Sequence, residues 1–211
     1  MTPAARSDRF PLACLAVVLV VMAWSVWKPF DLATWFLEVM PLLVAIPAFA
    51  ATRRTFPWTN LVYALVAFHG IVLMVGGHYT YALVPAGDWL KDAFHLSRNH
   101  YDRLGHLTQG FVPAILVREL LSRRSPVTAS AHAGWLFFFT TAICLAFSAC
   151  YEFLEWAVAV FGPNEQGIAF LGTQGDPWDT QWDMFLCLVG AVAAQLLLRR
   201  THDRQMSRLA L

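Results

Sequence analysis

The chain has 211 residues, of which 58% are hydrophobic and 14% are charged, and its formal net charge is +1. This composition is typical of an integral membrane protein, because each helical span needs about 20 mainly apolar residues. The near-neutral charge, without a basic patch interleaved with aromatic residues, excludes nucleic acid as a partner. The four cysteines lie inside apolar runs and predict no disulfide framework.

Six apolar runs predict an all-α, polytopic membrane protein with about six transmembrane helices in a single domain covering residues 1–211. The first run has a basic lead-in, but no small-residue cleavage site follows Trp24, so we expect it to remain as an anchor. The expected helices cover residues 11–27, 32–52, 58–76, 103–121, 134–155 and 178–198.

The distribution of basic residues predicts that both termini are cytoplasmic. With the N-terminus inside, the inner segments hold eleven of the fifteen Lys and Arg residues, and the outer segments hold four, namely Lys28, Lys91, Arg98 and Arg103. This excess follows the positive-inside rule. The segments 77–101 and 162–177 are then expected to be long loops on the outer face.

Ionisable residues on three expected helices are predicted to lie at one depth, near the outward-facing boundary of the membrane. Counting about 20 residues back from the inner end of the fourth helix places Asp102 at this boundary and His106 one turn below it. The fifth helix runs outward, so Glu152 and Glu155 reach the same level. The strictly apolar part of the sixth helix is too short to span alone, which draws Asp183 into the membrane.

Residue spacing places these groups in pairs on common helix faces. The pairs are Asp102 with His106, Glu152 with Glu155, and Asp179 with Asp183. Gln109 continues the first pair by one turn, and Glu38 of the second helix is expected to approach the same layer. Because like charges on one face repel, we expect a positive group to bridge them: Arg98, Arg103, a proton or a metal ion.

A divalent metal site is one hypothesis for this cluster. Its candidate ligands are Asp102, His106, Glu152, Glu155 and Asp183, with Gln109, Asp179, Arg103 and Glu38 as supporting residues. Imidazole together with carboxylates suits Zn, Mn or Fe, whereas carboxylates alone suit Mg or Ca. Such a metal would activate water or polarise a phosphoryl or acyl group at head-group level, which makes membrane lipids the expected partners.

Other readings of the same residues stay open at this stage. Asp176 before Pro177 is typical of a helix N-cap, and Asp179 in the first turn fits capping as well as ligation. A proton- or cation-coupled transporter would use the cluster as its coupling site, although transporters commonly place such sites near the midplane. A structural or partner-binding protein would neutralise the carboxylates with Arg98 and Arg103. The sequence does not choose between enzyme, transporter and structural protein, and it leaves the oligomeric state open.

Several strings resemble the YjdF-like family of predicted bacterial inner-membrane proteins, a domain of unknown function. They run from Gly76 to Tyr81, from Tyr101 to His106, from Tyr151 to Trp156 and from Phe170 to Met184, and the resemblance covers essentially the whole chain. It implies a multi-pass protein of the bacterial inner (cytoplasmic) membrane and supplies no chemistry.

A more distant similarity is to the VanZ-like membrane proteins. They have an Asp-x-x-x-His helix, then a helix with Glu, then a helix with Asp followed by Gly. This order corresponds here to Asp102 and His106, to Glu152 or Glu155, and to Asp183 before Gly190. The similarity implies a role at the cell envelope and names no substrate.

Overall fold

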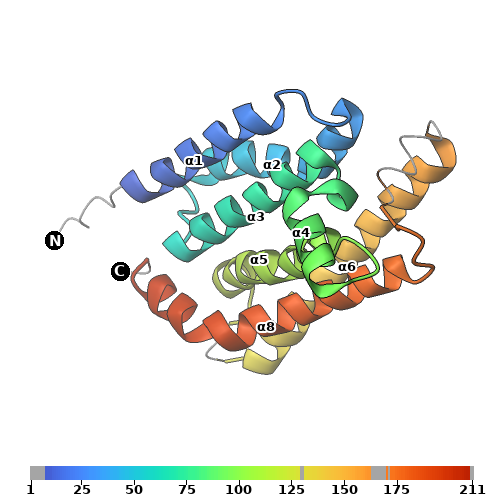
Figure 1. The fold of residues 1–211 in the computed structure, drawn as a ribbon. Helices are drawn as coiled ribbons and strands as arrows, with labels where there is room; N and C mark the ends of the chain where they lie inside the picture. The colour runs from blue at the N-terminus through green and yellow to red at the C-terminus, as the bar shows by residue number, and fades with distance from the viewer. Residues whose placement is uncertain (1–7, 129–130, 163–169, 171, 210–211) are drawn as a thin grey trace.

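The computed structural model describes residues 8–128, 131–162, 170 and 172–209, and within them the chain forms seven α-helices and one short 3₁₀ helix without any strand (Figure 1). The all-α prediction is confirmed for these residues. The elements are α1 (Arg9–Ser25), α2 (Leu32–Thr52), α3 (Asn60–Tyr79), η1 (Tyr81–Leu83), α4 (Pro85–Phe94), α5 (Tyr101–Arg124), α6 (Ala133–Phe161) and α8 (Asp179–Ser207).

Four of the described helices, α2, α3, α6 and α8, are long and apolar enough to cross a membrane, with mean hydropathy between 1.6 and 1.8. The other two expected spans also occur as helices. α1 falls short of this measure because it has only 17 residues, and α5 falls short because polar side chains follow one of its faces.

Three expectations about segment boundaries are wrong. The fifth expected helix, α6, does not end at residue 155 but continues to Phe161. The segment 77–101 is not simply a loop, because it contains the end of α3 and the whole of α4, which starts with Pro85 at its first turn and ends at His95 in the left-handed conformation. α8 does not end at residue 198 but continues to Ser207. Its polar extension stays helical because His202, with 0% exposure, packs into the bundle.

The closest helix pair is α5 with α8, and two glycines make this approach possible. A Cβ atom at Gly110 would lie 1.8 Å from the carbonyl oxygen of Cys187. At Gly190 it would lie 2.1 Å from the carbonyl oxygen of Leu107. Small residues at helix interfaces let backbones touch in this way. Since His106 precedes Gly110 by one turn and Asp183 precedes Cys187 by one turn, this contact brings the two side chains together.

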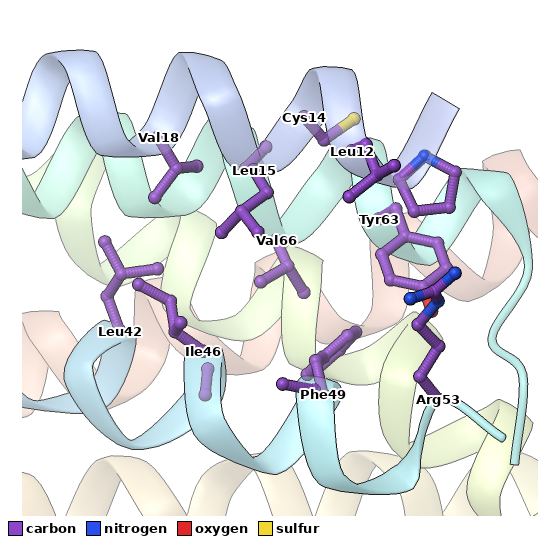
Figure 2. A pocket seen from close by; sticks show the side chains of 14 residues that line it. Leu12, Cys14, Leu15, Val18, Leu42, Ile46, Phe49, Arg53, Tyr63 and Val66 are labelled. Atoms are coloured by element: carbon purple, nitrogen blue, oxygen red, sulfur yellow. The ribbon is translucent and has the colours of Figure 1, made fainter. Parts of the chain in front are cut away.

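α1, α2 and α3 form the other half of the bundle. Trp35, Val39, Leu42 and Met74 are buried between these helices. Figure 2 shows an apolar pocket between the N-terminal ends of α1 and α3 and the C-terminal end of α2. Its volume is about 200 Å³, and Arg53, which lines it, forms an ion pair with Asp8. α3 also packs against α5, so it joins the two halves of the molecule.

Candidate functional site

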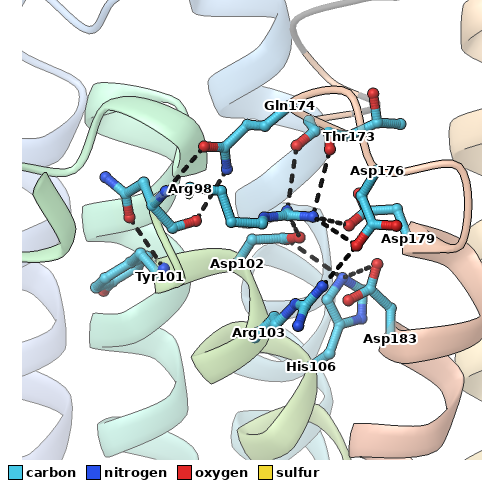
Figure 3. A network of polar contacts seen from close by, with 12 residues as sticks. Arg98, Tyr101, Asp102, Arg103, His106, Thr173, Gln174, Asp176, Asp179 and Asp183 are labelled. Atoms are coloured by element: carbon cyan, nitrogen blue, oxygen red, sulfur yellow. Dashed lines mark hydrogen bonds and ion pairs between the residues drawn. The ribbon is translucent and has the colours of Figure 1, made fainter. Parts of the chain in front are cut away.

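The outer part of the polar cluster is neutralised by arginine. Arg98, just before α5, forms an ion pair with Asp179 and lies 3.4 Å from Oδ2 of Asp102 and 3.6 Å from Oδ2 of Asp176 (Figure 3). Arg103 contacts the same oxygen of Asp176 at 2.7 Å. The guanidinium of Arg98 also donates to the carbonyl oxygen of Thr173, 3.3 Å away. We call Arg98, Arg103, Asp176 and Asp179 the arginine layer.

The inner part of the cluster surrounds His106 and is called the histidine layer, with Asp102, Glu152, Glu155 and Asp183 as its carboxylates. Nε2 of His106 lies 3.4 Å from Oδ1 of Asp102 and 3.9 Å from Oδ2 of Asp183. Nδ1 lies 3.8 Å from Oε1 of Glu152. Asp102 therefore connects the two layers, because one of its oxygens faces Arg98 and the other faces His106.

Gln109 sets the orientation of the imidazole. Its Oε1 lies 2.9 Å from Nδ1 of His106, one turn along the same helix face. Because an amide oxygen can only accept, Nδ1 carries a proton and donates it in this contact. In the neutral ring, Nε2 is then the free acceptor, and it is the atom that faces Asp102 and Asp183.

Two carboxylate oxygens in the histidine layer lack a hydrogen-bond partner among the described residues. They are Oδ1 of Asp183 and Oε1 of Glu152. The side chains of Asp183 and Glu152 are only 3% and 5% exposed, respectively. Leaving a buried charged oxygen unpaired is costly, so a proton or a cation is required near these atoms.

The half of the bundle formed by α1, α2 and α3 contributes Glu38, which lies on α2. This side chain is buried, and Tyr151 on α6 donates a hydrogen bond to its Oε2 at 3.2 Å. Glu38, Asp102, His106 and Glu155 line one end of a cavity of about 460 Å³ that lies between α2, α3, α5 and α6. The carboxylate cluster is thus accessible from a cavity and is not sealed inside the bundle.

The structure brings all five candidate ligands together. Ligand atoms of Asp102, His106 and Asp183 lie within 4.8 Å of one another, and so do those of His106, Glu152 and Glu155. Among the supporting residues, Gln109 and Glu38 adjoin the histidine layer, whereas Arg103 and Asp179 belong to the arginine layer.

Tyr151 was missed from the sequence. Its position four residues before Glu155, one turn away on the same helix, is the signal that could have found it.

The expectation that Asp176 is the N-cap of its helix is wrong, because α8 begins at Asp179 with Trp178 in the cap position. Oδ1 of Asp176 accepts a hydrogen bond from the backbone N–H of Trp178 at 2.9 Å, two residues further on. Its other oxygen contacts Arg103. Asp176 therefore shapes the turn before α8 and joins that turn to α5.

A second polar network lies at the opposite end of α5. Arg118 and Glu119 are adjacent in the sequence but have different ion-pair partners. Arg118 lies 2.7 Å from Asp203, and Glu119 accepts from Arg123 at 2.7 Å. Glu119 also accepts from the hydroxyl and the backbone N–H of Thr59, at the N-cap of α3, at 2.7 and 3.1 Å.

His202 joins these two groups. Its Nδ1 accepts from Arg118 at 3.0 Å, and its Nε2 lies 3.0 Å from Oε2 of Glu119. Arginine can only donate, so Nε2 carries the proton of the neutral ring. Apart from the Glu119–Arg123 pair within α5, these contacts join α5 to α8 or to the start of α3, and we assign the network a structural role.

Apolar helices of membrane-spanning length around a buried polar cluster define an integral membrane protein. Residues 10–204 match the family model described as "Predicted membrane protein (DUF2238)", and the chain belongs to this family. The chain is 45% identical over 181 residues to Inner membrane protein YjdF of Escherichia coli (strain K12), which covers 86% of this chain and 85% of that protein. No solved structure matches.

These comparisons confirm the YjdF-like resemblance and the location of this multi-pass protein in the bacterial inner membrane.

Proposed function

We propose that this protein binds a divalent metal ion in the histidine layer. It would use this metal to act on a lipid or other envelope substrate at the outward-facing surface of the inner membrane. One observation carries the proposal: Nε2 of His106 faces carboxylate oxygens of Asp102 and Asp183 at 3.4 and 3.9 Å. These distances exceed the roughly 2.7–3.2 Å of ordinary N–H···O bonds. Two ligands bound tetrahedrally at about 2.1 Å from a metal lie about 3.4 Å apart.

The tautomer of His106 supports the same assignment. Histidines that bind metals almost always donate their other N–H to an oxygen acceptor, which fixes the ring. Gln109 supplies that acceptor at Nδ1. Since the donor set contains imidazole and carboxylates, Zn, Mn and Fe suit it better than Mg or Ca.

Glu152 faces Nδ1 of the imidazole, where Gln109 already accepts a hydrogen bond, and Glu155 lies beside Glu152 and His106. We therefore assign them as further ligands or as carboxylates that hold a proton beside the metal. A metal bound here supplies an activated water or polarises a phosphoryl or acyl oxygen. Arg103 and Asp179 position this site through the arginine layer.

Two alternative functions were open from the sequence, a structural role and ion transport. The arginine layer supports a structural role for Asp176 and Asp179, whose charges Arg98 and Arg103 balance. Transport of an ion would need polar groups along the cavity towards the inner face. Between Gln109 and the far end of the cavity, the lining is mainly apolar, with polar side-chain atoms only on His69, Thr52 and Trp58, which favours a lipid substrate over an ion path.

We also propose six spans with both termini in the cytoplasm. The N-terminal end of α1 and the C-terminal end of α8 lie at the same end of the bundle (Figure 1). The polar cluster includes Asp179 and Asp183 at the opposite, N-terminal end of α8. Reporter fusions after Ser207 and within α4 test this arrangement. A cytoplasmic signal is expected after Ser207 and a periplasmic one within α4, and the reverse pattern would overturn the proposed orientation.

Elemental mass spectrometry of the purified protein in detergent, with Zn, Mn and Fe added in turn, tests the metal site. Wild type is expected to hold close to one metal per chain, and Asp183→Asn and His106→Ala to lose it while keeping their size-exclusion profile. Asp92→Asn, an exposed carboxylate on α4, is the matched control and should keep the metal. Metal-free wild type, or unchanged metal in Asp183→Asn, would overturn the proposal.

A further inference from the structure

We propose that the cavity beside the histidine layer holds one hydrocarbon chain of the lipid on which the protein acts. The inference rests on the proposed function for the head-group end of that lipid. It extends that function by assigning the substrate class: a lipid whose chain enters the protein while its polar head stays at His106.

The cavity has one polar and one apolar end. Glu38, Asp102, His106, Gln109 and Glu155 line the end next to the cluster. The rest of the lining is mainly apolar and comes from α2, α3, α5 and α6: Pro41, Val44, Phe49, Val66, Val112, Leu116. An amphiphile with a polar head and an apolar tail matches this division. The volume of about 460 Å³ lies in the range of ligand sites.

The length of the cavity suits a hydrocarbon chain. Asp102 and Leu120 both line it, and they lie eighteen residues apart on α5. At about 1.5 Å per residue this separation is about 27 Å, close to the ~30 Å thickness of the hydrocarbon core. A chain whose head lies at the membrane boundary can therefore extend along α5 without leaving the cavity.

The cavity is open sideways, towards the region that lipid tails occupy. Large apolar side chains at its rim are exposed: Val44 on α2 is 59% exposed, Leu120 on α5 is 42% exposed and Phe147 on α6 is 66% exposed. α2 packs against α3, while α6 packs against α5 and α8. α2 meets α6 at the hydrogen bond from Tyr151 to Glu38, at the polar end of the cavity, and residues of both helices line the rest of it.

The helices are shaped to leave this space. Pro41 and Pro113 lie inside α2 and α5 and line the cavity, and a proline removes one helical hydrogen bond and bends the helix. Ala45 and Ala48 also line it, so small side chains stand where larger ones would fill the gap.

Photolabelling in vesicles tests this inference. The protein is placed in phosphatidylglycerol vesicles containing a phosphatidylglycerol with a diazirine in one acyl chain, illuminated, and mapped by peptide mass spectrometry. We expect labels on α5 between Val112 and Leu120, in addition to those on the lipid-facing Leu196 and Leu197 of α8, which are 70% and 72% exposed.

Two variants separate the cavity from the general lipid surface. Ala48→Phe fills the cavity from α2 and should reduce α5 labelling at least five-fold while leaving the labels on Leu196 and Leu197 unchanged. Ala51→Phe, on the same helix but outside the lining, should change neither. Equal α5 labelling in wild type and Ala48→Phe, or labelling of α8 alone, would overturn the chain site.

Metal content measured on the same samples keeps the two proposals apart. Metal binding without Ala48-sensitive labelling of α5 removes the chain site and leaves the proposed metal site standing. Ala48-sensitive labelling in a protein that binds no metal supports the chain site and removes the proposed metal function.

Discussion

Gln109 accepts a 2.9 Å hydrogen bond from Nδ1 of His106 and thereby turns Nε2 towards Asp102 and Asp183. A single amide thus decides which nitrogen of the imidazole faces the carboxylates. Substitutions can test separately this hydrogen bond, the arginine layer and the packing of α5 against α8.

Replacing Gln109 tests whether it positions the proposed ligand. Gln109→Leu removes the acceptor at Nδ1, and loss of such a partner typically weakens metal binding by about 10- to 100-fold. Gln109→Glu keeps an acceptor oxygen and is expected to retain most of the affinity. Titration of apoprotein with Zn measures both variants. Equal affinities in wild type and Gln109→Leu would show that the contact does not orient the ring for metal binding.

Arg98 and Asp179 test the arginine layer as a structural unit. Their side chains are 5% and 6% exposed and form an ion pair. Arg98→Met leaves the Asp179 carboxylate buried and unpaired, so we expect a loss of about 3–5 kcal/mol in the free energy of unfolding. The double variant Arg98→Met/Asp179→Asn should recover part of that loss. Unfolding titrations in mixed micelles provide the measurement.

The same double variant should still bind metal, although more weakly, because Oδ1 of Asp102 still faces His106 while the support from the arginine layer is lost. A metal-free but folded double variant would contradict the division of the cluster into two layers.

The close approach of α5 and α8 gives a third prediction. Gly110→Ala places a Cβ atom against the backbone of Cys187 and must push the helices apart. We expect a loss of stability of about 1–3 kcal/mol, which is typical of overpacking, together with weaker metal binding. Gly134→Ala is the matched control, because a Cβ atom there meets nothing within 4 Å. Unchanged stability and metal binding in Gly110→Ala would rule out this contact as the feature that aligns His106 with Asp183.

His202 gives a fourth prediction, at the other end of the molecule. His202→Ala leaves Arg118 and Glu119 each without one buried partner, which we expect to cost about 2–3 kcal/mol of stability. The exposed His132 serves as control, and His132→Ala should stay within about 0.5 kcal/mol of wild type. Metal binding should be unaffected in both. A metal-free but folded His202→Ala protein would show coupling between the two networks.

Local periodicity and membrane thickness made much of this protein predictable. An apolar run of about 20 residues predicts a helix wherever it occurs, so helices lie at all six expected positions. The pairing of Asp102 with His106 follows from helical geometry alone, since residues four apart share a face. The common depth of Glu152 and Asp183 followed from counting rise per residue, and both reach the histidine layer.

Only the tertiary structure decided how those side chains are divided between partners. That Asp183 faces His106 and that Asp179 pairs with Arg98 depends on α8 lying against α5, where Gly110 meets the backbone of Cys187. The contact between Glu119 and His202 joins positions 83 residues apart. Such contacts have no local signature, because hydrophobic period and charge spacing describe one helix at a time. The sequence by itself determined the helices and predicted a common level for their charged groups, and the packing of α5 against α8 decided which of those groups form a site.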